Sequence, residues 1–416
     1  MSSATAGAAT QPSAAPLRVA ILGLGTVGRE VARALAERGP DLAAASAGRG
    51  LALAAVGVRE PRRDRGVPLP PAVPLTDDLA AVATGRAAPV DVVVELLGGL
   101  EPAGELVTAA LDRGAAVVTA NKALLARRGA ALEGHVRRLG ATLRFEAAVG
   151  GGLPILGPLG RDLAADRWQA VTGILNGTCN DILCRMDLRG TSYADALAEA
   201  QAAGYAEADP SGDVEARDTA DKLAILIRFA FGAWPDVTAI RRAPPALDGD
   251  GAPGITGVTG ALLAVARREG LVIRLVAHAE RAPHGEVAAW VMPAAVRADS
   301  GLGRTEWVDN RLELEAEPVG RVTITGPGAG GPATSSAVLG DLLAIARGEG
   351  STWGGLPPAP ATQIQPLDHL GPARRWLIAD APGNGFTSIR TVAQLRDELR
   401  GSGYQATLFP ILDEAR

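Results

Sequence analysis

The most restrictive feature of the sequence is a short apolar segment that runs directly into a glycine-rich turn and then a helical pattern. Residues 17–22 (LRVAIL) have the composition of a buried strand, and residues 23–28 read GLGTVG. In such a turn Gly23 permits the tight bend, Gly25 lets a pyrophosphate approach the backbone, and Gly28 allows close packing of helix on strand. Free N–H groups at the helix start face the anion. The pattern therefore predicts dinucleotide binding at Gly23, Gly25, Thr26, Val27 and Gly28.

The segments that follow alternate between short apolar runs and helical stretches. Strands are expected at 51–58, 91–96, 115–119 and 142–147, with helices at 29–38, 102–113 and 127–139. Alternation of this kind indicates a parallel sheet with helices on both faces. We predict an α/β fold with a Rossmann-type doubly wound parallel sheet, formed by residues 17–148 together with a returning helix within 333–349.

Beyond about residue 150 the pattern changes to long amphipathic helices and alternating strands. Helices are expected at 192–203 and 217–231, and strands at 272–281, 287–292, 311–316 and 319–325. This combination predicts a second, α+β domain over residues 149–332. Residues 1–16 are expected to be a disordered tail. Residues 350–416 are expected to be a linker and a small βαβ-like segment (strand 374–379, helix 392–402, strand 405–412), too small for a core of its own.

The end of the second strand bears on the choice between NAD and NADP. An acid there normally binds the ribose hydroxyl of NAD, whereas an arginine accommodates the 2′-phosphate of NADP. The strand ends in Arg59 and Glu60, with Arg62 and Arg63 close behind. Arg59 favours NADP and Glu60 argues for NAD, so we predict NADP with NAD as the alternative. Arg62 and Arg63 are expected to belong to a solvated loop.

Lysine is nearly absent from the chain. The two lysines, Lys122 and Lys222, are the only ones among 41 basic residues. Arginine does not lose its proton in proteins, whereas the amine of a lysine is tunable. Lys122 follows the fourth strand, at the sheet edge where ligands bind. Lys222 lies four residues after Asp218 on an expected helix, so the two share a face and can pair. We predict an acid/base site at these residues.

Acidic residues precede that helix on a loop rich in glycine and proline. Glu207, Asp209 and Asp213 are close together in sequence, but the calcium-loop pattern with its terminal Glu is absent. Capture of a substrate ammonium group is one interpretation, and helix capping by Asp213 is the other.

Composition excludes several classes of protein. The net charge of −5 argues against a nucleic-acid partner. No apolar run approaches the roughly 18 residues that would span a bilayer, and the first sixteen residues lack the features of a signal peptide. Two cysteines, Cys179 and Cys184, indicate a reducing compartment. We expect a cytoplasmic protein with no membrane association and a small-molecule substrate.

Several segments together resemble the homoserine dehydrogenase family. They cover residues 17–348 and include VVVELLGG (92–99), VVTANKALLA (117–126), FEAAVGGGLPI (145–155), GILNGT (173–178) and TGPGAGGPATSSAVLGDL (325–342). The most specific is EAQAAGYAEADPSGDVEARDTADKLAIL (199–226).

The resemblance implies NAD(P)-dependent interconversion of L-homoserine and L-aspartate 4-semialdehyde, in threonine and methionine biosynthesis. It implies that Lys222 is the general acid/base, Lys122 a second catalytic amine, and Asp218 the residue that orients Lys222. It further implies a homodimer formed through the second domain. The implied substrate contacts are Glu207, Asp213, Asn176, Gly177 and Thr178. Further implied cofactor contacts are Arg59, Thr119, Lys122 and Gly328. A monovalent cation, usually sodium, is implied at Glu146, Val149, Gly151 and Leu153, held mostly by main-chain oxygens.

The chain departs from the family pattern in a few places. Cys179 replaces a threonine and Asp181 an aromatic residue after the GILNGT segment, and a His-Pro pair is missing near 299–302. The segment after residue 350 is at most half of a regulatory ACT domain, so threonine feedback is not predicted either way.

Two other functions are compatible with the residues. One is a different aldehyde dehydrogenase with Cys179 as nucleophile, which needs a basic partner for the thiol. The other is a dinucleotide-sensing regulator without turnover, which would not need Lys122, Asp218 or Lys222.

Overall fold

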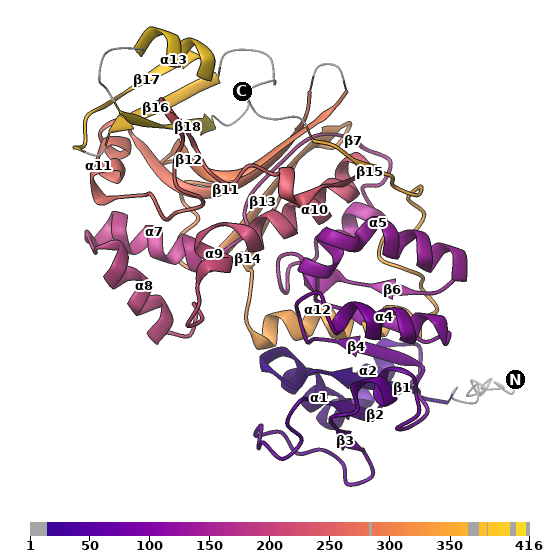
Figure 1. The fold of residues 1–416 in the computed structure, drawn as a ribbon. Coiled ribbons are helices and arrows are strands. Elements are labelled where there is room, and N and C mark those ends of the chain that lie inside the picture. Colours follow the sequence, from indigo (N-terminus) through magenta and orange to yellow (C-terminus); the bar gives the residue numbers. More distant parts are fainter. Residues whose placement is uncertain (1–14, 283–284, 365–373, 381, 400–404, 413–416) are drawn as a thin grey trace, which may run out of the picture. The chain divides into compact units, whose positions relative to one another are not determined.

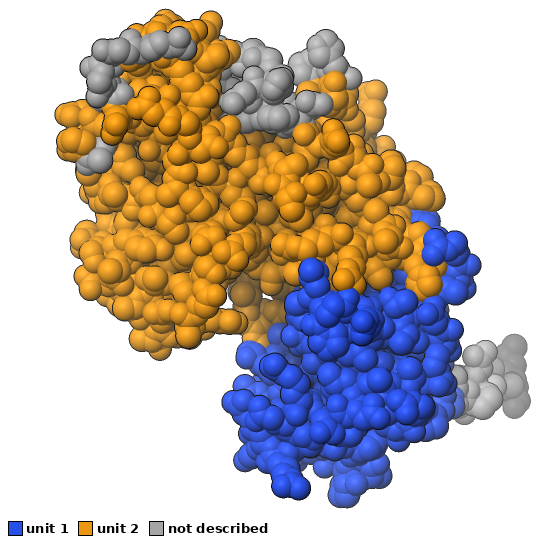
Figure 2. All heavy atoms as spheres, viewed as in Figure 1, with its two compact units in different colours: residues 1–120, 136–145, 335–351 blue, residues 121–135, 146–334, 352–416 orange. Residues whose placement is uncertain are grey.

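The computed structural model describes residues 15–282, 285–364, 374–380, 382–399 and 405–412. The chain divides into two compact units (Figure 2). Unit 1 comprises residues 1–120, 136–145 and 335–351, and unit 2 comprises residues 121–135, 146–334 and 352–416. This division differs from the expected boundaries, because it assigns residues 121–135, 146–148, 333–334 and the described part of the segment after 351 to unit 2. Of the tail expected to be disordered, residues 1–16, only residues 15 and 16 are among the described residues.

Unit 1 contains a six-stranded, all-parallel sheet in the order β3-β2-β1-β4-β5-β6 (Figure 1). This is the strand order of a dinucleotide-binding domain, with the topological switch between β1 and β4, and it confirms the predicted fold class. The central strands β1 and β4 are buried except at Arg18, and nearly all their residues are Val, Ile, Leu or Ala, as in a parallel sheet covered on both faces. The strands are β1 Leu17–Leu22, β2 Leu51–Gly57, β3 Leu75–Thr76, β4 Val92–Glu95, β5 Ala116–Thr119 and β6 Leu143–Arg144.

Helices connect these strands. They are α1 Thr26–Glu37, α2 Gly39–Ala45, α3 Leu79–Ala83, α4 Ala103–Asp112, α5 Lys122–Leu139 and α12 Gly331–Ala346. Helix α5 starts five residues earlier than the expected 127–139. Asn121 explains the early start, because its Oδ1 accepts the Leu124 N–H at 3.1 Å, as an N-cap residue does. The predicted fifth strand is shorter than expected and is followed by a 3₁₀ turn, η1 Glu146–Ala148.

Unit 2 is built on a mixed ten-stranded sheet whose main path is β10-β9-β18-β12-β11-β7-β13-β14. Its longest ladder joins β11 Leu271–Arg281 to β12 Val287–Arg297. The remaining strands on this path before the C-terminal segment are β7 Arg167–Ile174, β9 Pro245–Ala246, β10 Gly249–Asp250, β13 Asp309–Glu317 and β14 Gly320–Pro327. A separate short ladder joins β8 Trp234–Pro235 to β15 Ala361–Thr362.

Besides parts of α5 and α12, the described residues of unit 2 up to residue 334 form six helices. They are α6 Leu156–Gly160, α7 Gly177–Arg189, α8 Tyr193–Ala202, α9 Ser211–Val214, α10 Arg217–Phe231 and α11 Gly260–Arg268, with a 3₁₀ turn η2 at Val237–Ala239. The expected helices 192–203 and 217–231 correspond to α8 and α10. Strand β7 and helices α7 and α11 were not predicted. No helix among the described residues is long and apolar enough to cross a membrane.

The C-terminal segment differs from the predicted βαβ arrangement. It contains β16 Arg374–Asp380, β17 Gly385–Arg390, α13 Val392–Leu399 and β18 Ala406–Leu412. The prediction missed β17, and residues 400–402 of the expected helix lie outside the described residues. Strand β18 pairs antiparallel with β16 and, at its end, parallel with β12. The segment is therefore part of the large sheet of unit 2.

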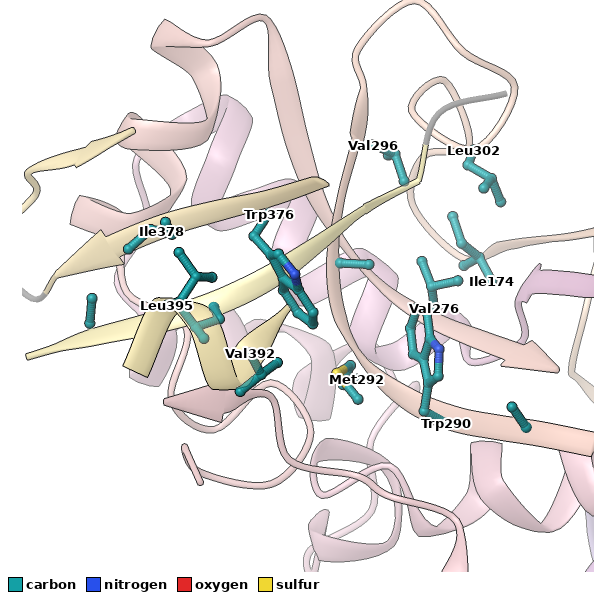
Figure 3. Packing of buried hydrophobic residues seen from close by; sticks show 14 residues of the cluster. Ile174, Val276, Trp290, Met292, Val296, Leu302, Trp376, Ile378, Val392 and Leu395 are labelled. Atoms are coloured by element: carbon teal, nitrogen blue, oxygen red, sulfur yellow. The ribbon is translucent and has the colours of Figure 1, made fainter. Parts of the chain in front are cut away.

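One hydrophobic cluster joins this segment to the sheet (Figure 3). Trp376 is 2% exposed and packs in a cluster with Trp290 and Met292, which are fully buried. Val392 and Leu395 of α13 lie in the same cluster. The small segment thus obtains its core by sharing that of the sheet.

Candidate active site

One carboxylate joins the two lysines of the chain. Asp218 lies in the first turn of α10, and its Oδ1 is 2.9 Å from Nζ of Lys122 at the start of α5. Its Oδ2 is 2.8 Å from Nζ of Lys222, one turn along the same helix. Lys222 Nζ also donates to the main-chain oxygen of Leu175 at 2.7 Å. All these residues belong to unit 2, so the predicted acid/base residues form a single cluster.

Asn176 and Asp213 extend the cluster. The Nδ2 of Asn176 donates to Oδ1 of Asp213 at 2.7 Å and to Oδ2 of Asp218 at 3.0 Å. The Oδ1 of Asn176 accepts the Cys179 N–H and so caps α7. Helices α5, α7 and α10 therefore all begin at this cluster. Their N-terminal dipoles favour negative charge there, which suits a site containing two carboxylates.

Burial and neighbouring charges both shift the pKa values of the ionisable groups in this cluster. Burial raises the pKa of Asp218, but the charges of Lys222 and Lys122 outweigh it and hold that pKa well below its usual range. The charge of Asp218 raises the pKa of Lys122, against burial. The pKa of Asp213 is raised by burial and by the charge of Asp218. At neutral pH Asp218 is thus a firmly ionised bridge between two amines.

The two amines differ in accessibility. The side chain of Lys122 is 37% exposed, whereas that of Lys222 is 11% exposed. The ammonium group of Lys222 contacts both a carboxylate and a carbonyl oxygen, and these two contacts fix its orientation. One of its three donors is left for another partner.

The turn before α10 is held in an unusual conformation. Ala216 has φ +63°, in the left-handed region that side chains other than glycine rarely adopt. The adjoining Val214 and Glu215 carbonyls accept hydrogen bonds from Ile255 N and Arg242 Nη1. A Cβ on Gly254 would lie 2.0 Å from Val214 O, so only glycine fits there. These contacts fix the relative directions of Asp213 and Asp218.

A second set of ion pairs between α5 and α10 was not predicted from the sequence. Arg127 Nη1 lies 2.7 Å from Asp221 Oδ1. Further along, Arg228 makes two 2.7 Å hydrogen bonds to Glu133, and both side chains are almost completely buried. Nothing in the sequence links these positions, because the partners are about 95 residues apart.

Only some of the predicted substrate contacts lie at the cluster around Asp218. Gly177 is required as glycine, because a Cβ would lie 2.5 Å from Val308 O. Thr178 donates its hydroxyl to Tyr205 O at 2.8 Å and so ties α7 to the loop after α8. Glu207 lies exposed in that loop, and within the described chain its carboxylate makes no hydrogen bond or ion pair with the cluster. The structure brings Asn176 and Asp213 to Asp218, but not Glu207.

A pocket in unit 1 coincides with the glycine-rich turn. Among the predicted cofactor contacts, Gly23, Gly25, Thr26 and Arg59 line it, while Val27 and Gly28 do not. A Cβ on Gly25 would meet no atom within 4 Å, whereas one on Gly28 would lie 2.1 Å from Gly23 O. Gly25 therefore leaves open space for a ligand, and Gly28 serves packing. Thr119 is fully buried at the end of β5, and Lys122 and Gly328 belong to unit 2.

Arginines also line this pocket. Arg29, Arg59, Arg63 and Arg65 line it together with Glu60 and Asp64, whereas Arg62 does not. Arg65 donates to the main-chain oxygens of Glu60 and Arg63, at 2.7 and 2.8 Å, and so closes the loop on itself. The sequence predicted a solvated loop for Arg63, but its side chain lines the pocket.

The predicted cation site, the loop of Glu146, Val149, Gly151 and Leu153, has main-chain oxygens that can coordinate a monovalent ion. The carboxylate of Glu146 is occupied by the N–H groups of Ile155, Leu156 and Gly157 at 2.6 to 2.8 Å. Within the described chain, the main-chain oxygens of Val149, Gly151 and Leu153 accept no hydrogen bond. Buried carbonyl groups normally have a partner. The loop therefore fits an ion held by main-chain oxygens, and the described residues contain no His, Cys, Asp and Glu cluster that would hold a metal by side chains.

The two substitutions in α7 have clear structural consequences. Burial strongly raises the pKa of the Cys179 thiol, helped by the charge of Asp213. Its Sγ donates to Asp213 O at 3.2 Å, so this thiol is not an activated nucleophile. Asp181 is buried and pairs with Arg185 at 2.7 Å, one turn further along the helix. Unit 2 therefore accommodates both residues, Cys179 through its hydrogen bond to Asp213 O and Asp181 through its ion pair with Arg185.

Unit 1 has a parallel sheet with a phosphate-binding turn, and in unit 2 one carboxylate pairs with two lysines. Together these features define a nicotinamide-nucleotide-dependent oxidoreductase. Sequence models of two domains match the chain: "Homoserine dehydrogenase, NAD binding domain" over residues 23–146 and "Homoserine dehydrogenase" over residues 154–343. The chain belongs to the homoserine dehydrogenase family.

Individual relatives agree with this assignment. A homoserine dehydrogenase of Mycobacterium tuberculosis is 42% identical over 380 residues, covering 88% of this chain and 82% of the relative. One of Corynebacterium glutamicum is 41% identical over 352 residues, covering 83% and 74%. The crystal structure of a homoserine dehydrogenase from Thiobacillus denitrificans has a TM-score of 0.82 and 28% identity, covering 96% of this chain and 98% of that one. A hyperthermophilic archaeal homoserine dehydrogenase in complex with NADPH shares the fold at 24% identity and a TM-score of 0.63, covering 79% of this chain and 97% of that one.

Proposed function

We propose that this protein interconverts L-homoserine and L-aspartate 4-semialdehyde with NADP, and that Lys222 transfers the proton. The observation that carries the proposal is the bridging of Lys122 and Lys222 by Asp218. Aldehyde reduction needs a hydride at carbon and a proton at the developing alkoxide oxygen. The bound nicotinamide supplies the hydride, and the protein has to supply the proton.

Lys222 is suited to this task because its ammonium is fixed by Asp218 and Leu175 O and has a donor left. In the reductive direction it stabilises the alkoxide and protonates it. In the oxidative direction the neutral amine removes the hydroxyl proton. Lys122, which shares the same carboxylate and is more exposed, is the second amine and exchanges protons with solvent. Asp218 orients both.

The substrate is a small amino acid, and the surrounding acids and amides suit its charged groups. The ammonium group binds near Asp213, with Glu207 as a further ligand; the hydrogen bond between Thr178 and Tyr205 O keeps the loop of Glu207 beside α7. Asn176, Gly177 and Thr178 contact the remainder of the substrate at the start of α7. The raised pKa of Asp213 supports this role, because a buried carboxylate next to another anion gains from a cationic ligand.

NADP is the proposed cofactor. Gly23, Gly25, Thr26, Val27 and Gly28 form its pyrophosphate turn, and Arg59 binds the 2′-phosphate. Arg63 supports the same preference, since it also lines the pocket. Thr119, Lys122 and Gly328 remain proposed contacts of the nicotinamide half. The archaeal enzyme of the same fold was described in complex with NADPH.

A monovalent cation, sodium by family resemblance, is proposed at the loop of Glu146, Val149, Gly151 and Leu153. The main-chain oxygens of Val149, Gly151 and Leu153, which accept no hydrogen bond within the described chain, support it. The ion would stabilise the loop and takes no part in proton transfer. A homodimer formed through unit 2 is proposed by family resemblance. The two free, buried cysteines support a reducing, cytoplasmic location.

The experiment is a direct assay with purified protein. Homoserine is mixed with NADP⁺ or NAD⁺, and the absorbance of the reduced nicotinamide is followed in sodium-containing and sodium-free buffers. The expected result is turnover that depends on homoserine, is faster with NADP⁺ and falls when sodium is replaced by a large organic cation. Absence of turnover with both cofactors contradicts the proposal.

A further inference from the structure

A fully buried acid lies behind the wall of the cofactor pocket. Glu95 is the last residue of β4, and its side chain has no exposed area. Its Oε1 accepts the N–H groups of Leu97 and Gly98 at 2.8 and 3.1 Å, and its Oε2 accepts the Thr119 hydroxyl at 2.5 Å. These bonds join the ends of two neighbouring strands of unit 1, β4 and β5.

The surroundings of Glu95 offer hydrogen-bond donors but no opposite charge. Each of its three partners is a neutral donor, so the carboxylate oxygens are hydrogen-bonded without being paired with a cation. Within the described chain no lysine, arginine or histidine pairs with Glu95. Burial of an acid without a cation is costly, so its presence at this position calls for a functional explanation.

The position of Glu95 relative to the sheet suggests that explanation. Leu96 and Leu97, which follow it directly, line the pocket. In this strand order one half of a dinucleotide binds at the ends of β1 to β3 and the other half at the ends of β4 to β6. The arginines after β2 mark the first side as that of the adenosine phosphate. The nicotinamide half therefore belongs to the side of Glu95.

We infer that Glu95 is a positioning residue that discriminates between the two oxidation states of the cofactor. The inference rests on the proposed function. Oxidised nicotinamide carries a positive charge and reduced nicotinamide does not, so a fixed negative charge behind the pocket wall favours the oxidised form. At the same time, Glu95 holds the turn of Leu97 and Gly98, and Leu97 lines the pocket that would hold the cofactor.

The variant Glu95→Gln separates charge from shape. The amide oxygen replaces Oε1 and still accepts from Leu97 and Gly98, and the amide nitrogen replaces Oε2 and donates to the Thr119 hydroxyl. Dissociation constants for NADP⁺, NADPH and 2′-phospho-ADP-ribose are measured by calorimetry on the full chain. The last ligand lacks nicotinamide and reports only on the adenosine half.

The expected result is that NADP⁺ binding weakens about fivefold in Glu95→Gln, from loss of one nearby charge, while the other two constants stay within about twofold. Thr119→Val, which keeps the charge and removes the hydroxyl that donates to Glu95, should change NADP⁺ and NADPH binding by equal factors. Equal weakening of all ligands in Glu95→Gln, or no weakening of any, overturns the inference. If the parent protein binds none of the three, the proposed cofactor fails instead.

Discussion

Arg127 and Asp221 repeat, about one turn further along α5 and α10, the ion pair that Lys122 and Asp218 make at the start of the same helices. The first of these pairs contains the proposed second catalytic amine. The two helices therefore face each other through successive charged contacts, and the position and charge of Lys122 depend on more than its direct partner.

The variant Asp221→Asn tests this dependence. The charge of Asp218 is the main cause of the raised pKa of Lys122, and Asp221 contributes in the same direction. Removing that charge lowers the pKa of Lys122. We expect the alkaline limb of the profile of kcat/KM against pH to move to lower pH. Asp299→Asn, which breaks an exposed pair with Arg297, is the matched control and should leave the profile unchanged. An unshifted limb in Asp221→Asn would show that Lys122 does not sense Asp221.

Replacement of Lys222 by arginine keeps the charge and removes the transferable proton. General acid/base catalysis contributes about 10²- to 10⁴-fold, so we expect kcat to fall by at least about a hundredfold in Lys222→Arg. Binding of NADPH, measured by fluorescence, should be retained because the cofactor pocket lies in unit 1. Turnover at the parental rate would refute the assignment of Lys222.

The variant Asp213→Asn should bind homoserine less well and be more stable at neutral pH. The pKa of Asp213 is raised by burial and by Asp218, so the folded state binds this proton more tightly than the unfolded chain does. The group therefore stabilises the fold below about pH 4 and loses this effect as pH rises through its folded pKa. We expect Asp213→Asn to raise the unfolding temperature at pH 7 but not at pH 3.5, and to raise KM for homoserine. Asp209→Asn, an exposed change on the same loop, serves as control. A lower unfolding temperature at pH 7 would contradict the electrostatic account.

Neighbouring arginines allow a sharp test of cofactor preference. Arg59 and Arg63 line the pocket and Arg62 does not. We expect Arg59→Ala and Arg63→Ala to raise KM for NADPH about tenfold, because each removes a charge-assisted contact to phosphate, with little change for NADH. Arg62→Ala should resemble the parent with both cofactors. Equal effects of all three substitutions would indicate general electrostatic attraction rather than a 2′-phosphate site.

The shared C-terminal core is tested by Trp376→Ala. Truncating a buried tryptophan costs about 3–5 kcal/mol, and Trp376 packs in a cluster with Trp290 of the central sheet. We expect loss of homoserine turnover together with a lower unfolding temperature. Phe386→Ala, at a position 43% exposed on β17, should change neither. If Trp376→Ala unfolded the C-terminal segment without affecting the rest, that segment would be an independent domain.

Regular patterns made the first unit predictable from the sequence. Five of its six described strands coincide with the predicted apolar runs, whereas the two-residue β3 was not predicted. The GLGTVG turn specifies a local geometry that depends on residues adjacent in the chain. The pairing of Asp218 with Lys222 was predictable for the same reason, since four residues make one helical turn. Even the early start of α5 had a local signal in Asn121.

Features that depend on distant segments were not predictable. The contact of Asp218 with Lys122 follows from the packing of two helices and has no local pattern. Glu95 appeared only as the end of an apolar strand, because the sequence does not reveal that Thr119 and two backbone donors surround it. Strand β17 was missed since its alternation is weak and its residues are largely exposed or half-buried.

The double pairing of β18, with β16 and with β12, has a consequence for biosynthesis. The ribosome makes β18 after every other described strand of the large sheet, so the edge of β12 that it covers stays open until residues 406–412 have been synthesised. Nascent chains halted before residue 406 would expose that edge, and quality-control proteases would meet an incomplete sheet rather than a finished enzyme lacking an accessory tail.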